Sequence, residues 1–475
     1  MSTINKQVGS QNNPVSLGGQ RNYQEVIEFL DLHWSPKNVP AKDLNAIKKV
    51  DQILGFPSKA TPIILVAGTN GKSLTIHFAT KLFKEERMKV GNFITPHILT
   101  YNERLVVNNE AISNKIFTEC ANEVINAAQT VGVELDTLEI LTLMALLHFK
   151  AQKVDVALLE MSNNTHFDPT NICYPKVLAI TRVTNEEMAP NNDKTVASID
   201  AMFEIVKQGT HVVSADQSKL NLQVMLESTQ KRNGVWAMPI RKLAMLPYPF
   251  EQLQGRCAAL AERICQIYIE TYSDKEATIV ANSLLAKQKG QRGRPTLEAK
   301  RQSEMNPKKT LDQFWKEEQA VLPAHFQILD KEKPTILLDN ASNIDALKNL
   351  LLGIRLLHYQ RPLKGLAFIF GCDKNEMNVD EFLRLLRYFS KKNSSLFTFC
   401  PIKENIPSIQ ENSWDVEQIT NDIKSLKIKA KSAKSFEEAF ENAKKAIDER
   451  HGLIIISGSK SIITEYWNYK GIKKI

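Results

Sequence analysis

A strand, a glycine-containing turn and a helix follow one another in the segment TPIILVAGTNGKSLTIHFATKLF, which spans residues 61–83. The apolar run from Ile63 to Ala67 predicts a buried strand. The turn GTNGKS occupies residues 68–73, and the residues after it have helical character. An arrangement of this kind is typical of loops that bind phosphate groups at the start of a helix.

The residue types in the turn match the chemistry of a polyphosphate site. Gly68 and Gly71 allow backbone angles that direct successive N–H groups towards an anion. Lys72 adds a mobile positive charge, and the Ser73 hydroxyl is a suitable ligand for Mg²⁺. We therefore predict that this loop binds ATP. The expected nucleotide-binding residues of the loop are Gly68, Thr69, Asn70, Gly71, Lys72 and Ser73.

The general pattern for such loops is met only in part. That pattern has a glycine five residues before the Gly-Lys pair, where this chain has Val66. The alternative interpretation is a chance glycine turn between a core strand and a core helix. The agreement of strand, turn and helix favours the phosphate-binding interpretation.

The whole chain has the composition of a globular protein with more than one domain. Its 475 residues are enough for two or three domains, and no apolar run approaches the ~18 residues of a membrane span. Residues 1–20 are polar and contain no signal-peptide core, so we expect a disordered tail and a cytoplasmic protein. None of the six cysteines forms a CxxC pair, which favours buried free thiols over disulfides or a metal site.

Most of the net charge of +8 lies in one segment. Residues 287–310 contain eight Lys or Arg residues and two Glu residues, and they show no apolar periodicity. We interpret this segment as a solvated insert or linker; the alternative is a contact with nucleic acid or with an acidic partner. Because the rest of the chain is close to neutral, we do not expect a dedicated nucleic-acid-binding protein.

Apolar strands alternate with helices along the chain, which predicts parallel sheets covered on both faces. Glu160 ends one such strand, at the sheet edge where ligands gather in this class of fold. The alternation restarts after the basic insert. We therefore expect an N-terminal P-loop-type ATP-binding domain over residues 21–328 and a C-terminal Rossmann-like domain over residues 329–475.

The order and spacing of the motifs resemble the folylpolyglutamate synthase/dihydrofolate synthase family of the Mur ligase superfamily, from about Tyr23 to the C-terminus. The TPH…NER block is the most specific of them. The resemblance implies an ATP-binding domain, a Rossmann-like Mur ligase domain and an active site between the two. The motifs that carry it are GTNGKS, ITPHILTYNERLVVNNEAIS, LEILT, DVALLE, DPTNICYPKVLAIT, LPAHFQIL, PTILLDNASN, FGCDKNE and IIISGSKSIITE.

The resemblance also implies roles for single residues. Glu160 matches the carboxylate that holds the metal, and Asp339 and Asn343 match positions of the DGAHN motif, whose Asp contacts the nucleotide from the second domain. His97, in the TPH block, is expected either to line the substrate pocket or to stabilise its own loop. The implied catalytic residues are Lys72 and Glu160, and the implied metal ligands are Ser73, Glu160 and Glu186.

Several departures from the family pattern fall on the chemistry. Asn185 and Glu186 replace an Asp-His pair, and Met202 replaces a lysine that is carbamylated in the family to bridge metals. The family's GxHQxxN motif becomes GRCAALA at residues 255–261. His325 stands where the family has an arginine and Ser342 where it has a histidine, while NNTHF replaces a Gly-Gly-Arg run.

Two functions are compatible with this pattern. The first is an ATP- and Mg²⁺-dependent ligase that phosphorylates a folate-type carboxylate and joins it to glutamate, acting as a monomer away from membranes. The second is a descendant with impaired catalysis, which keeps nucleotide binding or only the fold and serves as a regulator or scaffold. The feature that distinguishes them is whether other groups replace the charge lost at Met202, Glu186 and Ser342.

Overall fold

The computed structural model describes residues 19–34, 43–162, 167–184, 199–238, 240, 244, 246, 252–275, 279, 310–317, 322–374, 377–403 and 413–474. Most of the expected N-terminal tail, Glu186, and the basic insert apart from Thr310 lie outside these residues, so the expectations for them stay predictions. Within the described part of the chain, no helix is long and apolar enough to cross a membrane.

The first sheet has eight strands in the order β4-β3-β2-β5-β1-β6-β7-β8. The six neighbouring strands β2, β5, β1, β6, β7 and β8 are parallel, and β3 and β4 extend the sheet beyond β2 in antiparallel fashion. β1 lies between β5 and β6 and is buried along its whole length, as its continuous apolar run predicts. The strands are β1 (Ile63–Ala67), β2 (Val90–Phe93), β3 (Leu105–Val107), β4 (Glu110–Ala111), β5 (Val156–Glu160), β6 (Val177–Ile180), β7 (His211–Ser214) and β8 (Val235–Trp236).

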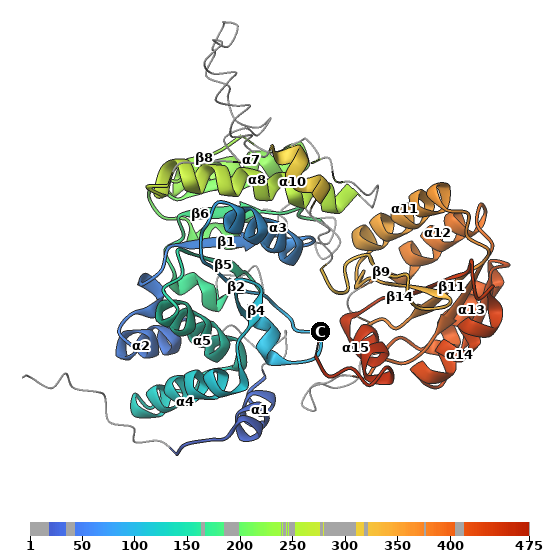
Figure 1. Cartoon of the computed structure of the whole chain (residues 1–475), viewed down its shortest axis with the longest axis horizontal. Helices are drawn as coiled ribbons and strands as arrows, with labels where there is room; N and C mark the ends of the chain where they lie inside the picture. Colours follow the sequence, from blue (N-terminus) through green and yellow to red (C-terminus); the bar gives the residue numbers. More distant parts are fainter. Residues whose placement is uncertain are drawn as a thin grey trace, which may run out of the picture.

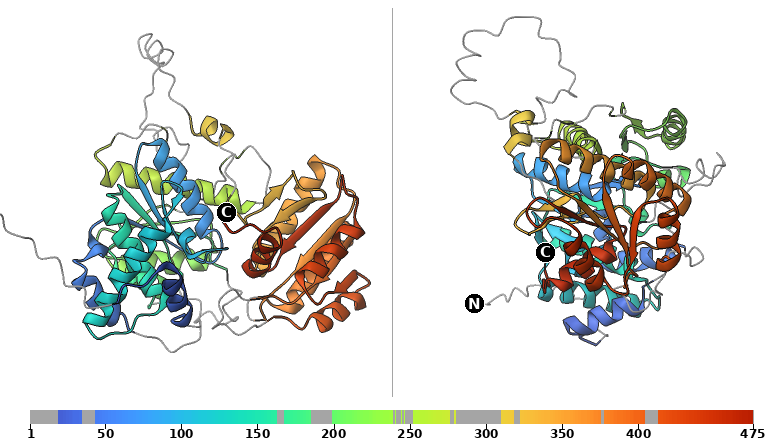
Figure 2. Two further views of the ribbon diagram at one scale, coloured as in Figure 1. Left: turned by 60° about the horizontal axis from the view of Figure 1, so that its bottom comes forward. Right: turned by 90° about the vertical axis from the view of Figure 1, so that its right-hand side faces the viewer.

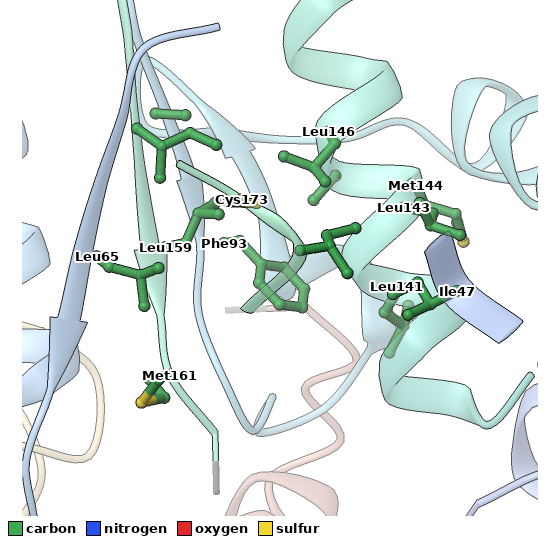
Figure 3. Close-up of a cluster of buried hydrophobic side chains, with 14 of the residues drawn as sticks. Ile47, Leu65, Phe93, Leu141, Leu143, Met144, Leu146, Leu159, Met161 and Cys173 are labelled. Carbon is green, nitrogen blue, oxygen red and sulfur yellow. The ribbon is translucent and has the colours of Figure 1, made fainter. Parts of the chain in front are cut away.

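Helices cover both faces of this sheet (Figure 1). Alternate residues of β1 enter two different cores: Leu65 packs with α1, α2, α4 and α5, whereas Val66 packs with α3, α8 and α10. Figure 3 shows part of the first core, where Leu65 and Leu159 of the sheet face Leu141 and Leu143 of α5. The helices are α1 (Tyr23–Leu32), α2 (Asn45–Ile53), α3 (Lys72–Glu85), α4 (Asn114–Thr130), α5 (Thr137–Ala151), α7 (Lys219–Lys231), α8 (Gln252–Tyr272) and α10 (Leu311–Glu317), with short 3₁₀ helices η1 (Pro57–Lys59), η2 (Tyr101–Arg104), η3 (Pro169–Ile172) and η4 (Phe203–Ile205).

The second sheet has six strands in the order β13-β12-β11-β14-β10-β9, all parallel except the β9–β10 pair. Its two faces carry separate apolar cores, one with α11, α12 and α13 and the other with α14 and α15. The elements are β9 (Gln327–Leu329), β10 (Thr335–Leu338), α11 (Ile344–Gln360), β11 (Leu366–Phe370), α12 (Val379–Ser390), β12 (Ser395–Phe399), α13 (Val416–Ser425), β13 (Lys429–Ser432), α14 (Phe436–Ala446), β14 (Leu453–Ser457) and α15 (Lys460–Tyr469).

The two sheets form two lobes that lie side by side, with α15 on the side of the second lobe that faces the first (Figures 1 and 2). The expectation of two α/β units, each built on a mainly parallel sheet, is confirmed. β9 pairs with the second sheet and begins at Gln327, so the second lobe takes in the last residues before the expected boundary at 328/329.

Candidate active site

The turn after β1 adopts a conformation that requires glycine at two positions. Gly68 has a φ of +121° and Gly71 a φ of +91°, both in the region that favours glycine. A Cβ atom at Gly68 would lie 2.3 Å from Thr181 Oγ1, and one at Gly71 would lie 2.5 Å from Cys257 Sγ. The backbone of the turn therefore lies directly against β6 and α8, and any side chain at either position would displace it.

The start of α3 is shaped as an anion site. Gly71 is the N-cap residue, and it has no side chain with which to cap the helix. The first N–H groups of a helix have no partner within the helix, and its dipole favours a negative charge there. Lys72 is the first residue of α3, and its Nζ lies 2.9 Å from Gly68 O and 3.3 Å from Thr69 O, folded back over the turn. These features fit a bound phosphate group.

The amides of the two middle residues of the turn are already engaged. Thr69 N and Asn70 N donate to Arg182 O at 3.0 and 3.3 Å. These bonds hold the turn against the residue that follows β6. The amides of Thr69 and Asn70 are therefore engaged within the protein, and the expected contact of these two residues with a nucleotide stays a prediction.

A hydroxyl and a carboxylate lie close together beside the GTNGKS turn of residues 68–73, which we call the phosphate loop. Ser73 Oγ donates to Glu160 Oε2 at 2.8 Å, and Thr95 N lies 3.4 Å from the same oxygen. Glu160 is buried at the end of β5, in register with Val66 of β1, which explains why two residues far apart in sequence come together. Oxygen ligands of this kind are those that Mg²⁺ prefers. Ser73 and Glu160 therefore fit a Mg²⁺ ion shared with phosphate oxygens.

Neither residue forms part of a larger cluster of ligands. Among the residues that the structure describes, no group of three or more His, Cys, Asp or Glu side chains could hold a metal ion. A Mg²⁺ ion bound together with a nucleotide needs only one or two carboxylates, because phosphates and waters supply the rest. Glu186, the third expected ligand, lies outside the described residues.

Residues of the second lobe contact the phosphate loop directly. The side-chain amides of Asn70 and Asn343 exchange two hydrogen bonds, at 2.8 and 3.0 Å. Asn70 Nδ2 also donates to Asp345 Oδ2 at 3.1 Å, and Asp345 Oδ1 lies 3.2 Å from Arg182 Nε. Asn343 is also the N-cap of α11, so the start of α11 is fixed to the loop. Asn70 and Asn343 were expected from the sequence motifs, whereas Arg182 and Asp345 were not. The one sequence signal for these two is position: Arg182 lies two residues beyond β6, and Asp345 lies two residues beyond the DNASN motif.

Asp339 contacts its own lobe. Its Oδ2 accepts a hydrogen bond from Phe326 N at 2.8 Å. Burial raises the pKa of this carboxyl from its ordinary value to about 7, and hydrogen bonds from the amides of Phe326 and Ala341 oppose that rise. Its expected contact with a nucleotide stays a prediction.

The raised pKa of Asp339 makes stability depend on pH. The folded protein holds this proton up to about pH 7, whereas the unfolded chain loses it near pH 4, so the contribution of Asp339 to stability declines as the pH rises between these values. We expect Asp339→Asn to remove this dependence, which is about 4 kcal/mol because the pKa rises by about three, at about 1.4 kcal/mol for each pKa unit. Thermal unfolding of both proteins without ligand, between pH 4.5 and 8, measures it. A stability difference that stays constant over this range would contradict the prediction.

His97 is held by a neighbouring arginine. Arg104 Nε lies 2.9 Å from His97 Nδ1, and burial keeps the pKa of His97 well below its ordinary value. Arg104 itself is completely buried, and its Nη1 and Nη2 atoms have no hydrogen-bond partner within the described structure. Sequence analysis did not single out Arg104. These contacts give His97 a role in its loop, and a contact with substrate stays a prediction.

Two of the departures from the family pattern, Met202 and much of the GRCAALA segment, lie in apolar cores. Met202 is 2% exposed and packs in the same apolar core as α4 and α5. Cys257, Ala258 and Ala261 are buried in the core between α8 and α3, and Cys257 Sγ lies 3.4 Å from Gly71 O. A small cavity beside the loop is lined by Arg182, Arg256 and Cys257, among others. His325 is half-buried, and its Nδ1 lies 2.9 Å from Pro323 O, a carbonyl that can only accept, so the ring nitrogen is the donor.

Comparisons with known proteins agree with this architecture. The chain is 30% identical over 226 residues to a dihydrofolate synthase/folylpolyglutamate synthase of Bacillus subtilis, a match that covers 46% of this chain and 49% of that protein. The chain thus matches about half the length of this curated relative. No protein-family model matches the chain.

Solved structures match nearly the whole chain at lower identity. Mycobacterium tuberculosis folylpolyglutamate synthase complexed with ADP has a TM-score of 0.72 and 18% identity, covering 94% of this chain and 98% of that one. The bifunctional folylpolyglutamate synthase/dihydrofolate synthase of Yersinia pestis with AMPPNP and Mn ion has a TM-score of 0.69 and 19% identity, covering 97% and 100%.

The two sheets and the loop between β1 and α3 give the chain a two-lobed α/β fold of the kind seen in these solved synthase structures. Within that class, the matches in sequence and in structure are folylpolyglutamate and dihydrofolate synthases. The resemblance that the motifs predicted is confirmed, at low identity.

Proposed function

We propose that this protein is an ATP-dependent ligase that joins glutamate to a folate-type carboxylate. The observation that carries the proposal is the Ser73–Glu160 pair, 2.8 Å apart, beside the uncapped start of α3. Relatives in sequence and in structure are enzymes named for this reaction, and two of the structural neighbours hold ADP or AMPPNP.

The residues of the site have separate roles in the proposed reaction. The start of α3 and Lys72 would bind the terminal phosphates of ATP, and Ser73 and Glu160 would hold Mg²⁺, which neutralises charge on the transferred phosphoryl group. The substrate carboxylate attacks the terminal phosphorus, and ADP leaves. The glutamate amine then attacks the acyl carbon, loses a proton and displaces phosphate to give the amide.

We further propose that residues 21–328 and 329–475 are the two functional domains, with residues 287–310 as an insert, and that the protein is a cytoplasmic monomer. All six cysteines are buried thiols that form no disulfide, which supports a reducing compartment. No nucleic acid or membrane partner enters this proposal.

The release of ADP tests the proposed function. The assay combines the protein, ATP, Mg²⁺ and glutamate with either dihydropteroate or tetrahydrofolate. We expect ADP to form only when the acceptor and glutamate are both present, together with a product heavier by one glutamyl residue in mass spectrometry. Nucleotide binding without any ADP release would instead favour the impaired alternative, for which the relatives in sequence and structure give no support.

Replacing Lys72 with alanine should weaken ATP binding at least tenfold, or about 1.4 kcal/mol, because the charge folded over the phosphate loop is lost. Isothermal titration calorimetry with Mg²⁺ measures this change. Lys84→Ala is a matched control, because Lys84 is an exposed residue of the same helix whose Nζ contacts Asn108 O instead. Equal ATP affinity in the two variants would remove Lys72 from the site.

A further inference from the structure

A lysine of the second lobe reaches into the candidate active site. Lys460 is the first residue of α15, directly after Ser459, which caps the helix. The turn that leads from β14 into α15 contains Gly458, with a φ of +112° and no room for a Cβ atom because Gly371 O would lie 2.6 Å away. The direction in which α15 begins is therefore fixed by the packing of this turn.

Two hydrogen bonds join the start of α15 to the first lobe. Lys460 Nζ donates to Pro96 O at 2.7 Å, and Thr464 Oγ1 donates to Ile98 O at 2.7 Å. Pro96 directly follows Thr95, whose amide lies 3.4 Å from the Glu160 carboxylate. The Lys460 ammonium group thus lies beside the segment that borders the expected metal site.

The charged groups that surround Lys460 include residues of the candidate active site. Besides burial, the groups that act on its pKa are Glu160, Arg104, Glu103 and Lys72. Burial lowers the pKa of Lys460 to about 8, and Glu160 opposes this change. An ammonium group has three N–H donors, and Pro96 O is the one hydrogen-bond acceptor it has within the described structure. The remaining N–H donors of the Lys460 ammonium group are therefore available to a ligand near Glu160 and Lys72.

We propose that Lys460 binds the terminal phosphate of the nucleotide from the second lobe, opposite Lys72. This inference deepens the proposed function and rests on the phosphate site described for it. Transfer of a phosphoryl group needs positive charge around its oxygens. Lys72 supplies a positive charge from the first lobe, and Lys460 supplies a second one from the other side.

The test compares two nucleotides that differ in the terminal phosphate. Isothermal titration calorimetry gives the affinity of the full-length protein for Mg²⁺-ADP and for Mg²⁺-AMPPNP. Lys460→Gln should weaken AMPPNP binding at least tenfold and change ADP binding less than twofold. Lys460→Arg should retain most of the preference for AMPPNP. Thr464→Val is the matched control, because it removes the neighbouring bond between the lobes and leaves the charge in place.

Three results would overturn the inference. Equal losses for ADP and AMPPNP in Lys460→Gln would show no role at the terminal phosphate. The same losses in Thr464→Val would show that only the contact between the lobes matters. A higher KM for glutamate, with the nucleotide preference intact, would place Lys460 at the amino-acid site. This test measures binding, so it is independent of the proposed ligation. If Lys460 is needed for AMPPNP binding but no ADP is released with acceptor and glutamate, the role of Lys460 stands and only the proposed ligation is contradicted.

Discussion

Replacing Glu160 with alanine is expected to lower glutamate ligation by about 10³-fold or more and to remove the Mg²⁺ dependence of nucleotide binding. The Glu160 carboxylate is buried and accepts the Ser73 hydroxyl at 2.8 Å, so it is positioned to hold the ion between itself and the phosphates. A metal ion contributes several kcal/mol to phosphoryl transfer, and each 1.36 kcal/mol corresponds to a factor of about ten in rate.

The measurement titrates Mg²⁺ in ATP binding and in ADP release, for the variant and the parent. Glu110→Ala, which removes an exposed carboxylate at the edge of the same sheet, should behave like the parent. Circular dichroism shows whether the Glu160 variant is folded. An unchanged Mg²⁺ dependence in a folded Glu160→Ala variant would exclude Glu160 as the metal ligand.

Met202→Lys should destabilise the first lobe by about 3–5 kcal/mol. The Met202 side chain is 2% exposed and lies among the apolar residues of the first core, next to Phe203 and Ile205. A lysine there would bury an ammonium group without a partner, which is among the most destabilising changes known for single residues. Urea unfolding followed by fluorescence and circular dichroism measures the loss.

Met202→Leu is the matched control and should cost less than about 1.5 kcal/mol, because it conserves volume and apolar character. The alternative outcome is also informative. A Met202→Lys variant that is as stable as the parent would show that position 202 faces the site rather than the core. Stability that returns on addition of bicarbonate and a divalent metal would indicate the same, because those are the components of a bridging carbamate.

The local elements of the site could be predicted from the sequence because their signals lie close together. An apolar run followed by GTNGKS specifies β1, the turn and the start of α3, and the structure has a positive φ at Gly68 and Gly71. Glu160 could be placed because the end of a parallel strand lies at the ligand-binding edge of a sheet.

The contacts between the lobes could not be predicted in the same way. Asn70 and Asn343 are 273 positions apart, and Lys460 and Pro96 are 364 apart. Hydrophobic periodicity defines which face of an element is buried, but it contains no information about how two separately folded sheets dock. Arg182, Asp345 and Lys460 therefore emerged only from the structure, as did the burial of Arg104 against Trp34 and Tyr101.

The paired amides of Asn70 and Asn343 have a consequence for how the two lobes separate. They and the Asp345 contacts are polar bonds, and each such bond contributes only about 0.5–1.5 kcal/mol net when water can replace it. Parting the lobes also breaks the bonds of Lys460 and Thr464 and removes Ile98 from the core beside α15, but most of each apolar core lies within one lobe. In the proposed ligase, ADP would therefore leave by a hinge motion between the lobes, on the microsecond-to-millisecond timescale of such motions.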